Sequence, residues 1–123
     1  MIQQPDLESL KGAVRGIVSL PGEGTYAEDT AAFNLAQVHH PDAVLGAVDA
    51  EDVRSAVVWA AHRSIPVAVQ ATGHNAAAPM DEGLLVNTSR LQDLHVDPES
   101  GTFSVGAGVR WDTALRELVS RGL

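Results

Sequence analysis

The stretch P-V-A-V-Q-A-T-G-H-N at residues 66–75 decides how this chain folds. Its first four residues are apolar and rich in β-branched valine, a composition that favours a buried strand. Ala71, Thr72 and Gly73 follow, and such small residues let a backbone turn tightly and approach another group closely. His74 comes directly after the glycine. The stretch therefore predicts a buried strand that ends in a small-residue bend carrying a histidine.

The segment before this stretch predicts a second strand and a helix. Val44–Val48 is an apolar run, and Asp49 follows it as a candidate helix cap. Apolar residues then recur at the spacing of one helix face between residues 53 and 60. Residues 44–70 thus predict a parallel strand–helix–strand unit with a right-handed crossover. The bend at residues 71–75 lies at the carboxyl end of the second strand, where open α/β sheets usually bind ligands.

This bend can bind an anion, because successive backbone N–H groups in a tight turn can converge on one phosphate. From the residues alone two readings of His74 stay open. It is either a hydrogen-bonded turn residue or a side chain that reaches a bound cofactor.

The rest of the chain predicts short elements around this unit. Before it we expect helices at 7–14, with Asp6 as its cap, and at 26–33, and a strand at 16–20. After it we expect strands at 83–87, 94–97 and 102–106, the last two joined as a hairpin by the turn at 97–101. An amphipathic helix over 111–119 follows, and Gly122 is placed to end it. The chain stops just after that helix, so we expect Leu123 to be a truncation point.

Composition limits the classes of function. The 123 residues suffice for one compact domain, and a formal net charge of -8 argues against nucleic acid or an anionic membrane surface as partner. No cysteine is present, which excludes a disulfide framework, a thiolate nucleophile and a cysteine-type metal site. No secretory signal or apolar run of membrane-spanning length is visible, so a cytoplasmic protein is the expectation.

The order of these motifs resembles a known family. The matching positions are Asn34, Pro41, Asp52-Val53, 66–75, 83–86, 88–91, 96–98, 105–111 and Gly122-Leu123. Together they resemble the FAD-binding domain of the p-cresol methylhydroxylase and vanillyl-alcohol oxidase superfamily, and within it the berberine-bridge-enzyme-like oxidoreductases. The resemblance covers nearly the whole chain.

The resemblance implies an α+β fold of the FAD-binding PCMH type, incomplete at its C-terminus. A small parallel subdomain at 1–75 would pack against the start of a second, antiparallel subdomain at 76–123, with FAD between them. The implied cofactor-binding residues are Ala71, Thr72, Gly73, His74, Asn75, Gly106 and Gly108. His74 occupies the position of covalent flavin attachment in many members. Gln70 and Ala78 stand where many relatives have arginine and glycine.

The implied function is oxidation of a small organic substrate by hydride transfer to FAD, with reoxidation of the flavin by dioxygen. Catalytic acid–base residues would lie outside this chain, in its missing C-terminal part. The alternative is a truncated fragment that does not turn over substrate, or an interaction module that associates with a partner or with a second copy.

For the other histidines, the tryptophans and the acidic residues we expect structural or surface roles. His39 and His40 read as surface residues, because adjacent side chains on an extended chain point to opposite faces and rarely share a metal; no metal site is expected. His95 is expected to face solvent. Trp59 and Trp111 read as packing residues, and the acidic residues as a solvated surface.

Overall fold

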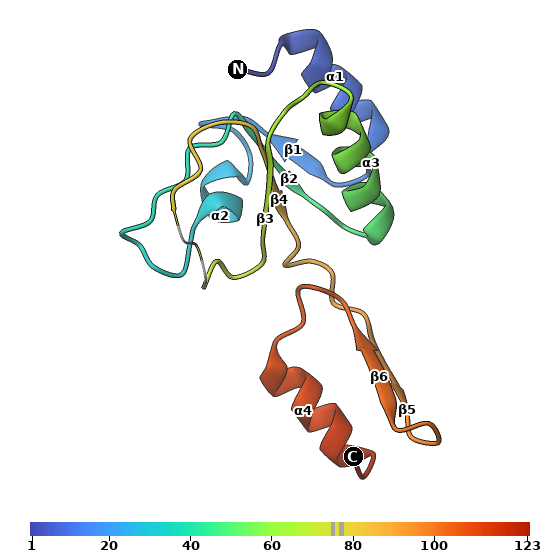
Figure 1. Cartoon of the computed structure of the whole chain (residues 1–123). Coiled ribbons are helices and arrows are strands. Elements are labelled where there is room, and N and C mark those ends of the chain that lie inside the picture. Colours follow the sequence, from blue (N-terminus) through green and yellow to red (C-terminus); the bar gives the residue numbers. More distant parts are fainter. Residues whose placement is uncertain (75, 77) are drawn as a thin grey trace.

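The computed structural model describes residues 1–74, 76 and 78–123, so the predicted contact of Asn75 lies outside the described residues. Figure 1 shows a sheet flanked by helices, with a hairpin and a helix standing away from it. The elements are α1 (Gln4–Ala13), β1 (Ile17–Ser19), α2 (Tyr26–Thr30), β2 (Ala43–Gly46), α3 (Ala50–Ala61), β3 (Val67–Gln70), β4 (Leu84–Asn87), β5 (Leu94–Asp97), β6 (Thr102–Val105) and α4 (Trp111–Ser120).

The first sheet has the strand order β1-β2-β4-β3. β4 pairs in parallel with both β2 and β3, whereas β1 runs antiparallel to β2. The predicted strand–helix–strand unit is confirmed in its direction, since β2 and β3 are parallel and α3 connects them. β4 nevertheless lies between the two strands, which the sequence order does not reveal.

β4 belongs to the first sheet, although it follows the expected division of the chain at residue 75. Its four residues are all buried, and it is hydrogen-bonded on both edges within the first sheet. An apolar strand buried on both faces belongs at the centre of a sheet. The first unit therefore extends through β4, and the second begins after it.

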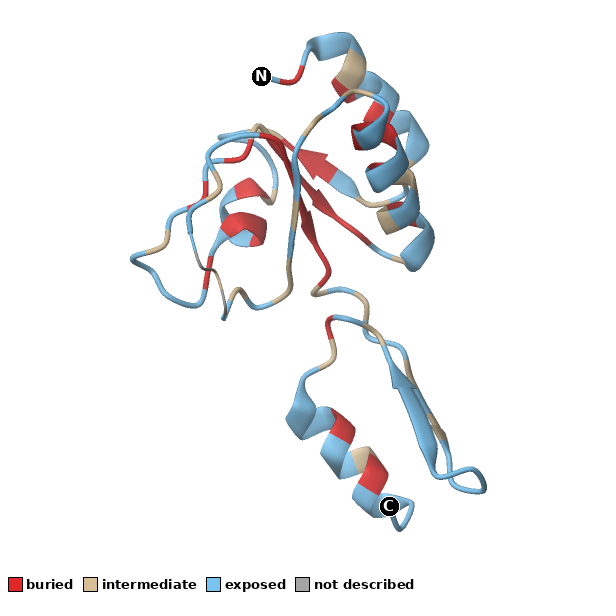
Figure 2. Ribbon diagram, in the orientation of Figure 1, coloured by how far each residue is buried: buried red, intermediate tan, exposed pale blue. Residues whose placement is uncertain are grey.

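The two faces of the sheet pack against different helices. Leu45, Leu84 and Val86 point toward α1 and α3 and form one core with them. Val44 and Leu85, displaced by one residue, point to the opposite face and pack with Tyr26 of α2. This alternation follows from the two-residue period of a strand. The buried strands and the exposed outer helix faces are distinguished in Figure 2.

α1 begins earlier than predicted. It starts at Gln4 after an extended Gln3, with no side-chain cap, and Pro5 occupies its first turn. Proline is favoured there because its missing N–H is not needed and its φ is already helical. Asp6 is therefore not the cap; its carboxylate instead pairs with Arg63 of the neighbouring helix region at 2.7 Å.

α3 is capped as predicted, since the side chain of Asp49 accepts a hydrogen bond from the N–H of Asp52. Asp52 itself is buried, contrary to the expectation that all acidic residues are solvated. Its carboxylate accepts hydrogen bonds from the N–H groups of Arg15, Gly16 and Val48, at 2.7, 2.9 and 3.0 Å. Burial alone would raise the pKa of Asp52, but these donors and the charge of Arg15 outweigh it and lower that pKa.

The second unit consists of the β5–β6 hairpin and α4, which packs near β5. All four residues of β6 are exposed, and α4 buries only Ala114 and Leu118. Trp59 packs in the core as predicted, but Trp111 is 67% exposed and touches only the edge of Phe103 among the aromatic residues described. The packing prediction for Trp111 is therefore wrong in this structure.

Candidate functional site

The bend at residues 71–74 leaves the sheet at the carboxyl end of β3, as the sequence predicts. The prediction that this strand is buried is wrong, because β3 lies at the edge of the sheet and its residues are exposed or half-buried. Gly73 has φ +74°, a conformation that side chains disfavour. A Cβ placed on Gly73 would lie 2.8 Å from the Cα of Ala32 and 3.1 Å from the nitrogen of Phe33. The N–H of Phe33 also donates to the carbonyl of Gly73 at 3.4 Å. Glycine is thus required here because the bend lies directly against residues 32–33.

The backbone N–H groups of the bend are available to a ligand. The β3–β4 register ends at Gln70. Among the described residues, the N–H groups of Ala71, Thr72, Gly73 and His74 donate to no protein acceptor. Consecutive free N–H groups in a turn form a concavity of positive potential that suits a phosphate. The local geometry therefore fits the diphosphate of a dinucleotide, even in a chain whose net charge is -8.

His74 is exposed, and its ring stacks on Phe33 with centroids 3.8 Å apart and planes inclined by 17°. The imidazole is therefore not turned into the aliphatic core. Phe33 is itself 65% exposed. The two rings form a small aromatic surface beside the bend.

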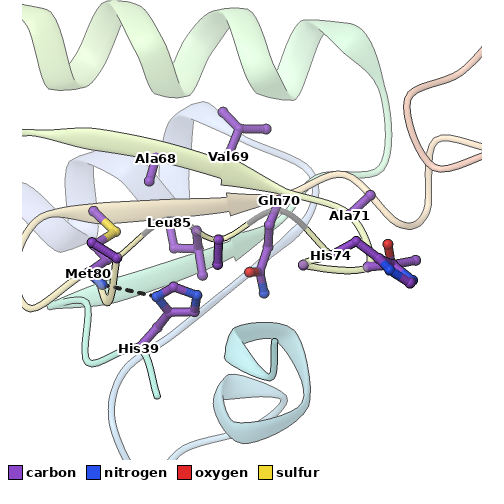
Figure 3. Close-up of a pocket in the computed structure, with 12 residues that line it drawn as sticks. His39, Ala68, Val69, Gln70, Ala71, His74, Met80 and Leu85 are labelled. Carbon is purple, nitrogen blue, oxygen red and sulfur yellow. Dashed lines mark hydrogen bonds between the residues drawn. The ribbon is translucent and has the colours of Figure 1, made fainter. Parts of the chain in front are cut away.

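Two hollows meet at the bend. The first, which we call the strand-end cavity, has a volume of about 350 Å³ and lies between the end of β3, His39, Met80 and Leu85 (Figure 3). The second, the inter-unit cavity, has a volume of about 240 Å³ and is bounded by the bend and by residues 107–111. Ala71, Thr72 and His74 line both. Small-molecule sites usually occupy about 300–1,000 Å³, so a dinucleotide would need both hollows rather than one.

Gly106 and Gly108 serve backbone packing. A Cβ on Gly106 would meet the carbonyl oxygen of Leu91 at 2.3 Å, and one on Gly108 would meet that of Ser89 at 2.5 Å. The N–H groups of both glycines donate to backbone carbonyls at 2.7 and 3.0 Å. These contacts hold the 106–110 turn against residues 88–93. The turn in turn places residues 107–111 on the wall of the inter-unit cavity.

His39 is buried, although the sequence analysis assigned it to the surface. It is 8% exposed, which corrects its assignment as a surface residue, whereas His40 and His95 are exposed as expected. Its Nδ1 accepts a hydrogen bond from the N–H of Met80 at 3.0 Å, and its Nε2 has no hydrogen-bond partner among the described residues. His39 thereby fixes the backbone of Met80, another residue that lines the strand-end cavity.

A partly buried ion pair lies next to the segment that contacts the bend. Asp29 of α2 is 2% exposed, and its carboxylate is paired with Arg90 at 2.9 and 3.2 Å. The side chain of Gln70 donates to the carbonyls of Asp29 and Ala31. Gln70 therefore ties α2 to the end of β3. No periodic pattern marks Asp29 in the sequence, because α2 is too short to show one.

Within residues 1–74, 76 and 78–123, no three His, Asp or Glu side chains cluster in a way that could hold a metal ion. In the same described part of the chain, the helices are too short or too polar to cross a membrane.

The fold and the bend together define an FAD-binding domain of the PCMH type. The chain belongs to the FAD binding domain family, which matches residues 41–123. The cofactor of this family is FAD, as the sequence predicts, and the free N–H groups of the bend fit its diphosphate.

Individual relatives agree with this assignment. FAD-dependent monooxygenase FUP4 of Fusarium proliferatum is 31% identical over 85 residues, which cover 67% of this chain and 16% of the fungal protein. The structure of 6-hydroxy-D-nicotine oxidase from Arthrobacter nicotinovorans superposes with a TM-score of 0.81 at 19% identity, over 99% of this chain and 26% of that one. Xylooligosaccharide oxidase from Myceliophthora thermophila gives a TM-score of 0.82 at 24% identity, over 94% and 25% of the two chains.

These matches cover only part of each relative. The chain spans about a sixth of the fungal monooxygenase and about a quarter of the two oxidases. The structural likeness is below 25% identity and therefore shows the fold alone. The comparisons place the chain in an oxidoreductase family. They do not identify its substrate or its reaction.

Proposed function

We propose that this chain forms part of the cofactor site of an oxidase-type, FAD-dependent oxidoreductase. In this proposal the N–H groups of residues 71–75 hold the FAD diphosphate, and His74 lies beside the flavin ring. The observation that carries it is the run of unpaired N–H groups at the end of β3, with hollows on both sides. Residues 107–111 would form the opposite wall.

The proposed reaction is the oxidation of a small organic molecule. Bound FAD accepts a hydride from the substrate and is reoxidised by dioxygen, while the protein orients the cofactor and tunes it. None of the proposed cofactor-binding residues has an acid–base role in this scheme, so those groups would belong to other parts of the enzyme. The names of the relatives, which include oxidases and a monooxygenase, support this class of reaction.

We further propose that FAD is attached covalently to His74. Neutral imidazole is a nitrogen nucleophile near neutral pH, and the ring is exposed at the bend. Attachment would form one bond from an imidazole nitrogen to the 8α carbon of the flavin, with loss of one proton from that carbon and one from the imidazole N–H. The two electrons left on the flavin would pass to dioxygen, the oxidant of the proposed reaction, which with the two protons becomes hydrogen peroxide.

The test uses His95 as a matched control, because it is also exposed but lies on β5. Wild-type protein is incubated with FAD in air, desalted, and examined for yellow colour before denaturing electrophoresis. We expect a fluorescent protein band for wild type and for His95→Ala, and none for His74→Ala. A chain that retains no FAD through desalting would contradict the proposed function, and an equally fluorescent His74→Ala would contradict the attachment site.

A second candidate function is a module without turnover that associates with a partner or a second copy. Three apolar side chains on one face of α4 favour it: Trp111, Leu115 and Val119 are 67%, 54% and 69% exposed. Sedimentation of the chain with and without FAD separates the candidates. A self-associating chain that never takes up FAD would support the second and contradict the first.

A further inference from the structure

We propose that Phe33 is a positioning residue for His74. Its ring holds the plane of the imidazole by stacking and leaves the edge of the imidazole free toward the flavin. This inference rests on the proposed function, because it assigns a partner to the residue that would contact the cofactor.

The stack has the geometry that such a role needs. The ring centroids are 3.8 Å apart and the planes are inclined by 17°, so Phe33 covers one face of the imidazole. The lone pair of an imidazole nitrogen lies in the ring plane. Stacking therefore restricts the tilt of His74 without covering its nucleophilic atom, whereas a hydrogen bond to that nitrogen would occupy it.

The backbone that carries Phe33 is fixed, although its side chain is exposed. Ala32, the preceding residue, is buried against Gly73, and the N–H of Phe33 donates to the carbonyl of that glycine. The side-chain amide of Gln70 donates to the carbonyls of Asp29 and Ala31 at 3.1 and 3.2 Å. Residues 29–33 are thus tied to the end of β3, which is the strand that carries His74.

The ion pair of Asp29 and Arg90 completes this support. The guanidinium binds both carboxylate oxygens, and Thr25 donates a third hydrogen bond to the same carboxylate at 2.6 Å. Asn87 of β4 donates to the carbonyl of Asp29 at 2.9 Å. The segment under the His74 ring is therefore anchored to two strands, β3 through Gln70 and β4 through Asn87.

The first arm of the test measures the stack without FAD. The C–H resonances of His74 are assigned by comparison with His74→Ala and are recorded for wild type, Phe33→Leu, Phe33→Tyr and Leu35→Ala. We expect an upfield ring-current shift in wild type, in the tyrosine variant and in Leu35→Ala, a control because Leu35 is 83% exposed in the same segment. Phe33→Leu should lose the shift, because leucine keeps apolar bulk but has no ring.

The second arm measures the rate of covalent FAD attachment in the same variants. Without the stack, a smaller fraction of His74 rings should keep the orientation that attachment needs. From the usual strength of an aromatic pair, we expect attachment to slow by about 2- to 12-fold in Phe33→Leu. Phe33→Tyr should restore the wild-type rate, and reversible FAD binding should change little in both variants. A general folding defect would instead weaken reversible binding and would not be rescued by tyrosine.

The outcomes separate this inference from the proposed function. If Phe33→Leu keeps the wild-type shift of His74 and the wild-type rate, Phe33 is not a positioning residue. If wild type binds FAD but attaches none, covalent attachment fails, and the resonance shift alone then decides for or against the stack. A wild-type His74 without an upfield shift overturns the inference whatever the flavin result.

Discussion

Replacing Gly73 by alanine tests the geometry of the bend most severely. Holding a non-glycine residue at φ +74° costs about 1–2 kcal/mol. The new Cβ would also meet the Cα of Ala32 at 2.8 Å, where only a backbone shift can relieve the contact, and such overpacking costs about 1–3 kcal/mol. We therefore expect Gly73→Ala to lower the free energy of unfolding by about 2–5 kcal/mol.

Gly101→Ala is the matched control. Gly101 has φ +68°, but nothing lies within 4 Å of the position of its Cβ. Gly101→Ala should therefore lower the free energy of unfolding only by the cost of holding alanine at a positive φ, about 1–2 kcal/mol. Urea unfolding followed by far-UV circular dichroism measures the free energy of unfolding of both variants. With a slope of about 1–3 kcal/mol per molar urea, the Gly73→Ala midpoint should fall by roughly 0.7–5 M. Equal losses in the two variants would show that the bend does not lie against residues 32–33, and the reasoning would be refuted.

Three further predictions follow from buried charges and from net charge. Asp52→Asn should lower the free energy of unfolding at pH 7 by about 1–3 kcal/mol. Folding lowers the pKa of Asp52, so its contribution to the free energy of unfolding is present above the unfolded-state pKa and is lost as pH falls through the folded-state pKa. The urea midpoints of wild type and Asp52→Asn should therefore converge on acidification. A gap that stays constant with pH would contradict this. Arg90→Met should lower the free energy of unfolding by about 2–4 kcal/mol, less than the loss of a partner from a fully buried ion pair, because Arg90 is partly exposed. A thermal melt unchanged from wild type would show that Asp29 does not need its partner. FAD affinity measured by equilibrium dialysis should hold or rise with added salt, since the chain carries a net charge of -8; a steep loss would indicate binding by a basic patch.

The sequence predicts the local elements well because their signals are local. The β-branched run before the bend, the cap at Asp49 and the turn at 97–101 each depend on a few neighbouring residues, and the structure places the corresponding elements within a few residues of the prediction. The family resemblance then supplies the cofactor. These parts needed no knowledge of distant contacts.

The parts that the sequence does not reveal depend on contacts between distant residues. β4 lies between β2 and β3 because its apolar strand needs neighbours on both edges, and the chain order carries no sign of this insertion. His39 and Asp29 are buried through partners that lie tens of residues away, at Met80 and Arg90. The stack of Phe33 on His74 likewise joins residues from two separate segments.

The most direct test of the account is an amide-resolved titration of the ¹⁵N-labelled chain with FAD. The central claim is that the free N–H groups of residues 71–74 bind the diphosphate, so their resonances should move first and should move downfield as hydrogen bonds form. ADP, which contains the same diphosphate without the flavin, should move the same amides. Saturation by FAD with these four amides unmoved, and shifts confined to other segments, would contradict the account.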